Sequence, residues 1–426
     1  MSPRQLSLDA RFVLAVLTRS PIPVSEIDVR LVHDLVDGPP EHTEHVLDDL
    51  LGAGELTEGW AGVWALTRVP AADDDLVHAR RARRGHDPQD ALLRWLVGLA
   101  VAADRAVDPL SWRPSSDTTN SWPFDGRTGA IAWWELHRAQ LLTLVDLLSA
   151  RGSWSLTWTL ADAVCGLAQA TGYAHAQVTT AKLGLWAVEA DHHDAVDQDH
   201  GQDRLAGYLV RRAWFTVRLA TGTGDVGGHD TAQRLADQGV DYARRSGDPA
   251  VLSSALRARA RIIHAAHAVR RYDHAIHDLR QALALDLARG DLAAQGLDRR
   301  RLGELLAAAD RGPEGLAELE QAVELLGRAG DEVGRAVAFT VAGHLLVDAD
   351  QVGQALPQLR DALTVLAPVG TPWQLARTYH GLARAAHVTG AHEIESTYRR
   401  RAAAFYRDAN APQLAADLDA TADDHD

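Results

Sequence analysis

The sequence predicts an all-α protein: a solenoid of stacked helical hairpins, preceded by a small domain of three helices and a β-hairpin. An amphipathic segment recurs every forty residues, and the composition is rich in Ala with only 6% aromatic residues, which favours helices. A chain of 426 residues is also too long for one compact core. The predicted ranges are 1–69 for the small domain, 70–152 for a helical linker with a Trp-rich loop at 111–124, 153–410 for the solenoid, and 411–426 for a capping helix and polar tail.

The small domain comes first in the chain. Apolar residues recur at helical spacing in residues 6–20, and residues 24–36 predict a second helix. Residues 39–54 predict a third helix, which begins at paired prolines and ends at a glycine. Alternating apolar residues around Gly59–Gly62 predict a small β-wing. This order of elements resembles a winged helix.

The charge of this domain bears on whether it binds DNA. The third helix of a winged helix enters the DNA groove and needs Arg, Lys, Asn or Gln at its exposed positions. Residues 41–49 offer Glu, His, Thr and Asp instead, and residues 1–69 hold five Arg against eleven Asp or Glu. Because phosphates repel such a surface, we favour a packing or protein-contact role for this domain.

The linker contains two distinctive stretches. Residues 78–87 hold four arginines, which we interpret as a solvated helix end before an Asp87-Pro88 cap. Residues 129–152 form a long amphipathic segment that contains Trp133-Trp134-Glu135 and Arg138-Ala139-Gln140-Leu141.

The repeats follow. A small-large-small pattern recurs on one face of a helix in each unit, and small residues on the helix before it allow the two helices to approach closely. A glycine ends each helix in the left-handed conformation, and Asp248, Asp291, Asp331 or Thr371 caps the next one. The repeated positions are Ala275, Leu279, Ala282 and Gly290; Gly315, Leu319, Ala322 and Gly330; Ala355, Leu359, Ala362 and Gly370; Glu395, Arg399, Ala402 and Asn410.

Each unit is a helical hairpin that cannot bury its own apolar face, so the units must stack. The pattern resembles the tetratricopeptide repeat (TPR) in a longer, forty-residue form, from which the last unit departs at Glu395 and Arg399. Weaker units at 154–190 and 204–248 bring the total to about six hairpins. The resemblance also places Gly343 where two helices approach closely.

With the repeats and the winged-helix-like domain, residues 129–152 resemble the junction in bacterial SARP-type STAND regulators. Those proteins combine a nucleotide-binding domain, a winged helix and forty-residue TPR units. The resemblance covers nearly the whole chain but only the back half of the family. The family's phosphate-binding loop, Gly-x-x-x-x-Gly-Lys-Ser/Thr, is absent, and Lys182, the single lysine, follows Ala181. We therefore expect no nucleotide switch and no cofactor in this chain.

Bulk properties exclude several functions. The net charge of −15 argues against broad attraction to nucleic acid or anionic membranes. The single Cys165 excludes an intramolecular disulfide and a Cys-based zinc site. Asp9 and Arg11 interrupt the first apolar segment, which excludes a signal peptide, and the longest apolar run, Trp95–Ala103, is too short to span a bilayer. We expect a soluble, cytoplasmic protein.

Metal binding and catalysis find little support. Residues 191–203 hold three His and five Asp, which suit a divalent metal, but the stretch lacks a fixed ligand spacing and reads better as a polar loop. His42 and His45 lie three residues apart without the His-Glu-x-x-His pattern. No nucleophile–base pair stands out. We expect neither a resident metal nor enzymatic activity.

The TPR resemblance also assigns a binding surface. In such arrays the first helix of each hairpin lines the concave face, and here that helix carries recurring Arg and His. These side chains suit carboxylates on a partner, and the arginines should make the histidines harder to protonate. The alternative is that they are ordinary solvated positions. The assigned residues are Arg257, His264, His267, Arg300, Glu304, Thr340, His344, Asp348, Arg377, His380, Arg384 and His387.

Two functions therefore compete. The first is a non-enzymatic regulator or adaptor that binds an acidic protein or peptide on the concave face of its repeats. The second is a transcriptional regulator whose winged helix binds DNA and whose repeats sense a peptide or small ligand. An enzyme with a metal site near residues 191–203 is the weakest reading, and a homo-oligomer stays open.

Overall fold

The computed structural model describes residues 6–21, 24, 26–36, 39–58, 63–67, 77, 87–114, 124–194, 201–409 and 411–420. The chain divides into two compact units, the first formed by Met1–Ala106 and Asp117–Val164, the second by Val107–Ser116 and Cys165–Asp426. None of the helices in the described ranges combines the length and the apolar character needed to cross a membrane. The division between the units falls inside a helix, α7 (Trp154–Thr171), twelve residues beyond the predicted end of the linker at 152.

The first unit begins with helices and a small antiparallel sheet, as predicted, and the strand order is β1-β3-β2. Val63–Leu66 is the central strand and pairs with both neighbours. Buried apolar residues of the three helices, such as Phe12, Leu31 and Leu50, form the core beside it. The elements are α1 (Leu8–Leu17), β1 (Glu26–Asp28), α2 (Val29–Val36), α3 (Pro40–Gly52), β2 (Leu56–Glu58) and β3 (Val63–Leu66).

The prediction of one helix over residues 24–36 is wrong at its start. Residues Glu26–Asp28 form strand β1, which pairs with β3 and fully buries Ile27. Asp28 then begins α2, because its Oδ1 accepts a hydrogen bond from the backbone N–H of Leu31 at 3.0 Å. The same oxygen accepts one from Nε1 of Trp95 at 3.1 Å. The strand therefore depends on partners distant in the sequence.

Two long helices, α5 (Pro88–Val107) and α6 (Gly126–Ala150), follow, and the first part of α7 completes the first unit. Asp87 accepts a hydrogen bond from the backbone N–H of Gln89 at 3.1 Å, as expected for the predicted cap. In α6, Trp134 is fully buried, whereas Leu136 is exposed. The arginine-rich stretch at 78–86, the wing turn at 59–62 and most of the Trp-rich loop, at 115–123, lie outside the described residues.

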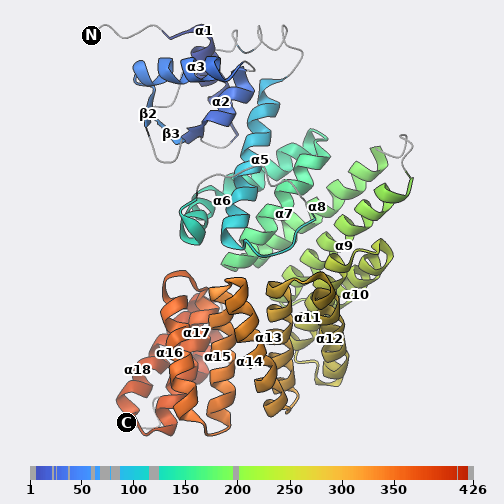
Figure 1. Cartoon of the computed structure of the whole chain (residues 1–426), viewed down its shortest axis with the longest axis vertical. Coiled ribbons are helices and arrows are strands. Elements are labelled where there is room, and N and C mark those ends of the chain that lie inside the picture. Colours follow the sequence, from blue (N-terminus) through green and yellow to red (C-terminus); the bar gives the residue numbers. More distant parts are fainter. Residues whose placement is uncertain are drawn as a thin grey trace. The chain divides into compact units, whose positions relative to one another are not determined.

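The predicted array of helical hairpins is confirmed, and consecutive hairpins lie beside one another (Figure 1). The fold is therefore all-α apart from the small sheet. The hairpins are α7–α8 (Trp154–Thr171, Ala174–Asp194), α9–α10 (Gly201–Asp225, His229–Ser246), α11–α12 (Pro249–Ala265, Tyr272–Arg289), α13–α14 (Leu292–Ala308, Gly312–Ala329), α15–α16 (Glu332–Asp348, Val352–Val369) and α17–α18 (Pro372–Val388, His392–Asp408), followed by α19 (Pro412–Ala420).

Local chemistry sets the helix ends inside the array. Gly247, Gly290 and Gly330 adopt the left-handed conformation, with φ of 74°, 68° and 76°, as predicted. Gly370 does not: its φ is −73° and its ψ is 150°. The next residue, Thr371, is extended because it precedes Pro372, and it begins α17 with a complete capping box. The predicted caps Asp248, Asp291 and Asp331 also accept hydrogen bonds from the first turns of their helices.

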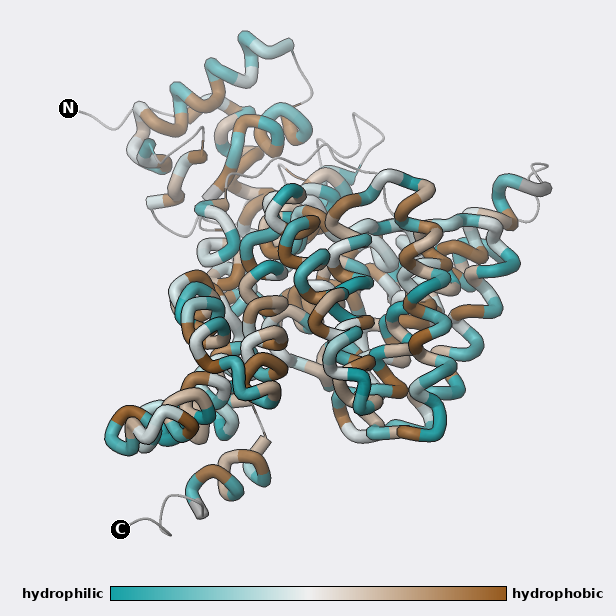
Figure 2. The backbone as a smooth tube through the Cα atoms, turned by 60° about the horizontal axis from the view of Figure 1, so that its bottom comes forward, coloured by the Kyte–Doolittle hydropathy of each residue, from teal (hydrophilic) through white to brown (hydrophobic). Residues whose placement is uncertain are grey.

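The small-large-small positions form the core of the array. Apolar and polar residues alternate along each repeat helix, as Figure 2 shows, and the apolar positions pack between neighbouring helices. The last hairpin keeps this geometry with charged residues, because Glu395 is buried and forms ion pairs with Arg399 and His387. The repeated positions that are at most 1% exposed are Ala275, Leu279, Ala282, Leu319, Ala322, Ala355, Leu359, Ala362 and Ala402.

Replacing Gly343 with leucine should lower the free energy of unfolding by about 1–3 kcal/mol. A Cβ atom at Gly343 would lie 2.6 Å from Cγ of Leu359 in the paired helix, so α15 and α16 would have to separate. The matched control is Gly353→Leu, because a Cβ there would meet no atom within 4 Å. Thermal unfolding of both variants checks the prediction. Equal melting temperatures for the two would contradict it.

Candidate partner-binding surface

The candidate surface lies where the first helices of consecutive hairpins, α11, α13, α15 and α17, contact one another. We call it the first-helix face, and its polar residues connect these helices across the repeats. Arg257 on α11 donates to Asp298 of α13, and Glu304 of α13 lies near Arg377 of α17. Polar side chains thus join helices that an apolar core would otherwise join alone.

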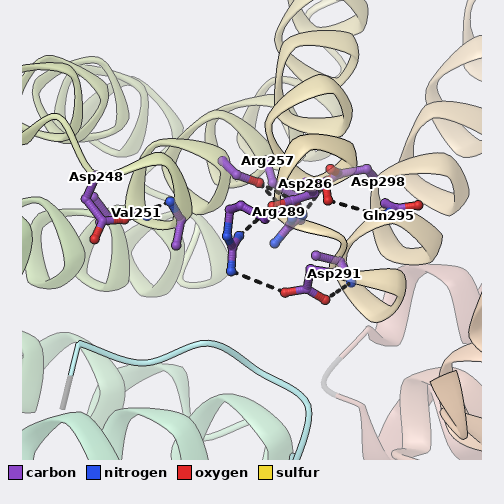
Figure 3. A network of polar contacts seen from close by, with 11 residues as sticks. Asp248, Val251, Arg257, Asp286, Arg289, Asp291, Gln295 and Asp298 are labelled. Carbon is purple, nitrogen blue, oxygen red and sulfur yellow. Dashed lines mark hydrogen bonds and ion pairs between the residues drawn. The ribbon is translucent and has the colours of Figure 1, made fainter. Parts of the chain in front are cut away.

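Arg257 is the centre of a buried ion-pair network, drawn in Figure 3. It donates from Nη2 to Oδ2 of Asp286 at 2.7 Å and from Nε to Oδ1 of Asp298 at 2.5 Å. Both carboxylate side chains are fully buried. Arg289 donates to the other oxygen of Asp286 at 2.6 Å, and Ser253 also donates to Asp286. The network joins α11, α12 and α13, so the prediction of an open, partner-facing Arg257 is wrong.

The two carboxylates of this network compete for the same cation. Burial, reinforced by the neighbouring Asp286, raises the pKa of Asp298 to about 7 against the lowering effect of Arg257. Oδ2 of Asp298 is buried and has no hydrogen-bond partner among the described residues. The network connects α11, α12 and α13 and therefore acts as an internal lock between hairpins.

A second group, which we call the Glu304 cluster, consists of Arg300, Arg301, Glu304 and Arg377. Arg300 donates to Oε1 of Glu304 at 3.1 Å, and Arg301 donates to Oε2 at 3.2 Å. Nη1 of Arg377 lies 3.6 Å from Oε1. Glu304 and Arg300 are buried, whereas the side chains of Arg301 and Arg377 are 30% and 32% exposed.

The Glu304 cluster has more positive than negative charge. Burial favours the neutral acid, but Arg300, Arg301 and Arg377 more than offset it and lower the pKa of Glu304 to about 2. Burial and the neighbouring Arg300 lower the pKa of Arg301 to about 9. Burial also lowers the pKa of His264, which lies beside this group. Three guanidinium groups thus face one carboxylate, which leaves a surplus of two positive charges.

Histidines extend the polar contacts toward α17. Nε2 of His344 lies 2.9 Å from the backbone oxygen of Arg377, to which it donates, and the His344 and His380 rings are 5.7 Å apart. Burial first, and nearby arginines second, lower the pKa of His344 to about 3 and of His380 to about 4. For His344 and His380 the lowered pKa agrees in direction with the predicted resistance to protonation, although burial contributes more than the arginines.

The structure places the remaining predicted residues in different settings. Thr340 is buried and its hydroxyl lies 2.9 Å from that of Thr378, so it is not open to a partner. Asp348 is exposed and pairs with Arg384. His267 lies in the turn after α11, with φ of 49°. His387, at the end of α17, pairs with Glu395 of the following helix. Arg300, Glu304 and Thr340 are buried, which a solvent-facing groove position does not predict, and their assignment to partner binding stays a prediction.

Arg301 is the functional candidate that sequence reasoning missed. It is the third residue of Arg299-Arg300-Arg301, and the repeat register assigns the face to Arg300. A helix turns about 100° per residue, so both neighbours can reach a carboxylate four or three residues later. The Arg triplet followed by Glu304 is the signal that could have identified it.

The chain itself covers the matching face of an earlier hairpin. Trp214 of α9 precedes Gly247 by the same number of residues as Arg257 precedes Gly290, so the two occupy equivalent positions. Trp112, in the segment after α5, packs edge-to-face on Trp214 with ring centroids 5.4 Å apart. Arg218 lies over the Trp214 ring, 4.6 Å from its centroid.

The other candidate sites have less support. The exposed face of α3 carries Glu41, Glu44, His45 and Asp48, an arrangement that disfavours phosphate contacts. No group of three or more His, Cys, Asp or Glu in the described residues is arranged to hold a metal ion. Residues 195–200 of the His- and Asp-rich loop lie outside that part of the chain.

Comparison with known proteins gives structural similarity at low sequence identity. No family model and no curated protein matches the sequence. BtubC (BKLC) from P. vanneervenii shares 16% identity over 56% of this chain and 92% of its own, with a TM-score of 0.44. A Rap protein complexed with Competence and Sporulation Factor shares 10% identity over 82% of this chain and 91% of its own, with a TM-score of 0.45. A STAND protein with a tetratricopeptide repeat sensor from Pyrococcus horikoshii shares 11% identity, with a TM-score of 0.47, over 99% of this chain and 64% of its own.

Proposed function

We propose that the protein is a non-enzymatic regulator or adaptor that binds an acidic segment of a protein partner on the first-helix face. The carrying observation is the Glu304 cluster, which holds a surplus of two positive charges in a chain of net charge −15. Surrounding negative charge repels nonspecific anions, and a local positive surface selects a partner with a matching charge pattern.

The exposure of individual arginines supports this assignment. Arg377 and Arg384 keep about a third of their side chains exposed, at 32% and 36%. They lie seven residues apart on α17, which places them on one side of that helix. Trp373, four residues before Arg377, is 44% exposed and adds an apolar surface beside them. Arginine and tryptophan are enriched among the residues that contribute most to protein interfaces.

Replacing Arg377 and Arg384 together with glutamine should weaken partner binding at least tenfold while changing the free energy of unfolding by less than about 1 kcal/mol for each residue. The partner is identified by co-purification from the native cell, and its affinity is then measured at two salt concentrations. The control is Arg328→Gln, since Arg328 is 59% exposed on α14. Unchanged affinity in the double variant would show that the partner binds elsewhere.

The first unit fits the same role. Its order α1-β1-α2-α3-β2-β3, with β3 between β1 and β2, is that expected of a winged helix. The acidic exposed face of α3 favours contact with protein over DNA. The competing function, a DNA-binding regulator, requires binding of duplex DNA that weakens with added salt.

A further inference from the structure

The Glu304 cluster brings guanidinium groups from two helices to one point. Arg300 and Arg301 of α13 each donate one Nη1–H to Glu304, and Nη1 of Arg377 approaches from α17. A guanidinium carries five N–H donors, so each arginine engages Glu304 through only part of its capacity. Glu304 therefore holds Arg300 and Arg301 in place but accepts only one hydrogen bond from each of them.

One of these donors is both buried and unused. The Arg300 side chain is 9% exposed, and its Nε–H has no hydrogen-bond partner among the described residues. A buried donor without a partner is unfavourable, and a bound acceptor relieves that penalty. Arg301 and Arg377 are each about a third exposed, so an anion from solvent can reach the cluster.

The charge surplus fits a dianion better than a single carboxylate. A carboxylate brings one negative charge and leaves one positive charge uncompensated, whereas a phosphate monoester brings about −1.5 to −2 near neutral pH and three acceptor oxygens. The convergence of three guanidinium groups on one point also favours a phosphoryl group. Two carboxylates spaced along a peptide need separated arginines, while one phosphoryl group can accept hydrogen bonds from several arginines at once.

We infer that the Glu304 cluster binds the phosphoryl group of a phosphorylated segment of a protein partner, an inference that rests on the proposed function. Trp373 and Arg384, on the same side of α17 as Arg377, provide contacts for residues that flank the phosphorylated one. Free phosphate has no flanking residues, so it would make no contact with Trp373 and Arg384. Glu304 acts here as a positioning residue, because it accepts hydrogen bonds from Arg300 and Arg301 and holds their guanidinium groups in place.

Titration of the full chain with three probes tests the inference: a phosphoserine peptide flanked by glycine and glutamate, its serine counterpart, and inorganic phosphate. At pH 8, calorimetry should show the phosphopeptide binding at least tenfold more tightly than the serine peptide and than inorganic phosphate. Arg301→Gln and Arg377→Gln should each remove this preference, and Arg328→Gln should keep it. Circular dichroism of each variant confirms that it is folded.

Several results would overturn the inference. Equal affinity for the phosphorylated and unphosphorylated peptides would exclude a phosphoryl site, and a preference that survives Arg301→Gln would place it elsewhere. If inorganic phosphate bound as tightly as the phosphopeptide, the site would recognise free phosphate, and a phosphorylated protein segment would be excluded as its specific ligand. Partner binding that depends on Arg377 and Arg384 without any phosphopeptide preference would refute this inference alone. A phosphopeptide preference with partner binding independent of both arginines would instead refute the proposed function.

Discussion

Replacing Glu304 with leucine should lower the free energy of unfolding by about 3–5 kcal/mol, the usual effect of removing one partner from a buried ion pair. The substitution leaves Arg300 buried without a counter-ion and leaves Arg301 and Arg377 repelling one another. Urea unfolding at pH 7, monitored by circular dichroism, measures the change. The control is Glu314→Leu, because Glu314 is 55% exposed in a surface pair with Arg311 and should have a much smaller effect.

The pH dependence of this effect follows from the Glu304 carboxyl. Its pKa is lowered from 4.5 to about 2 in the folded protein, so its ion pairs stabilise the fold above pH 4.5, and that contribution is lost as the pH falls toward 2. This change in the pKa of Glu304 corresponds to about 3 kcal/mol in the free energy of unfolding. The stability difference between wild type and Glu304→Leu should therefore narrow by that amount between pH 6 and pH 2. A constant difference across that range would contradict the assigned ion pairs.

Replacing Asp286 with alanine should also lower the free energy of unfolding by about 3–5 kcal/mol. The variant removes the carboxylate shared by Arg257, Arg289 and Ser253, and it leaves Arg257 with Asp298 alone. Three helices would lose a common contact. Urea unfolding measures the change, with Asp241→Ala as control, since the Asp241 side chain is 73% exposed. A loss below about 1 kcal/mol would show that the network adds little to the stability of the array.

Features that depend on neighbouring residues were predictable. The Asp248, Asp291, Asp331 and Thr371 caps each bind backbone N–H groups two or three residues ahead, so their function is visible in a short window. The forty-residue period likewise repeats one hairpin, which is why the hairpins were located correctly. Strand β1 was missed because its pairing partner, β3, lies almost forty residues away.

The candidate surface was predictable only in part. The repeat register identified the helices and most of the polar residues that meet on their shared face. It gave no information on which arginine finds an internal carboxylate. Arg257 pairs with Asp286 and Asp298, residues 29 and 41 positions later. Because of these pairs, a residue predicted to contact a partner instead joins neighbouring hairpins.

The sequence by itself determined the repeat, the ends of the repeat helices and the sign of the charge on each of them, because these depend on side chains within one or two helical turns of one another. Only the tertiary structure decided which charges remain available. Stacking the hairpins buries Asp286, Asp298 and Glu304, and a buried carboxylate must be paired with a cation. That requirement occupies Arg257 and concentrates the surplus charge at Arg301 and Arg377, where three guanidiniums share a single carboxylate.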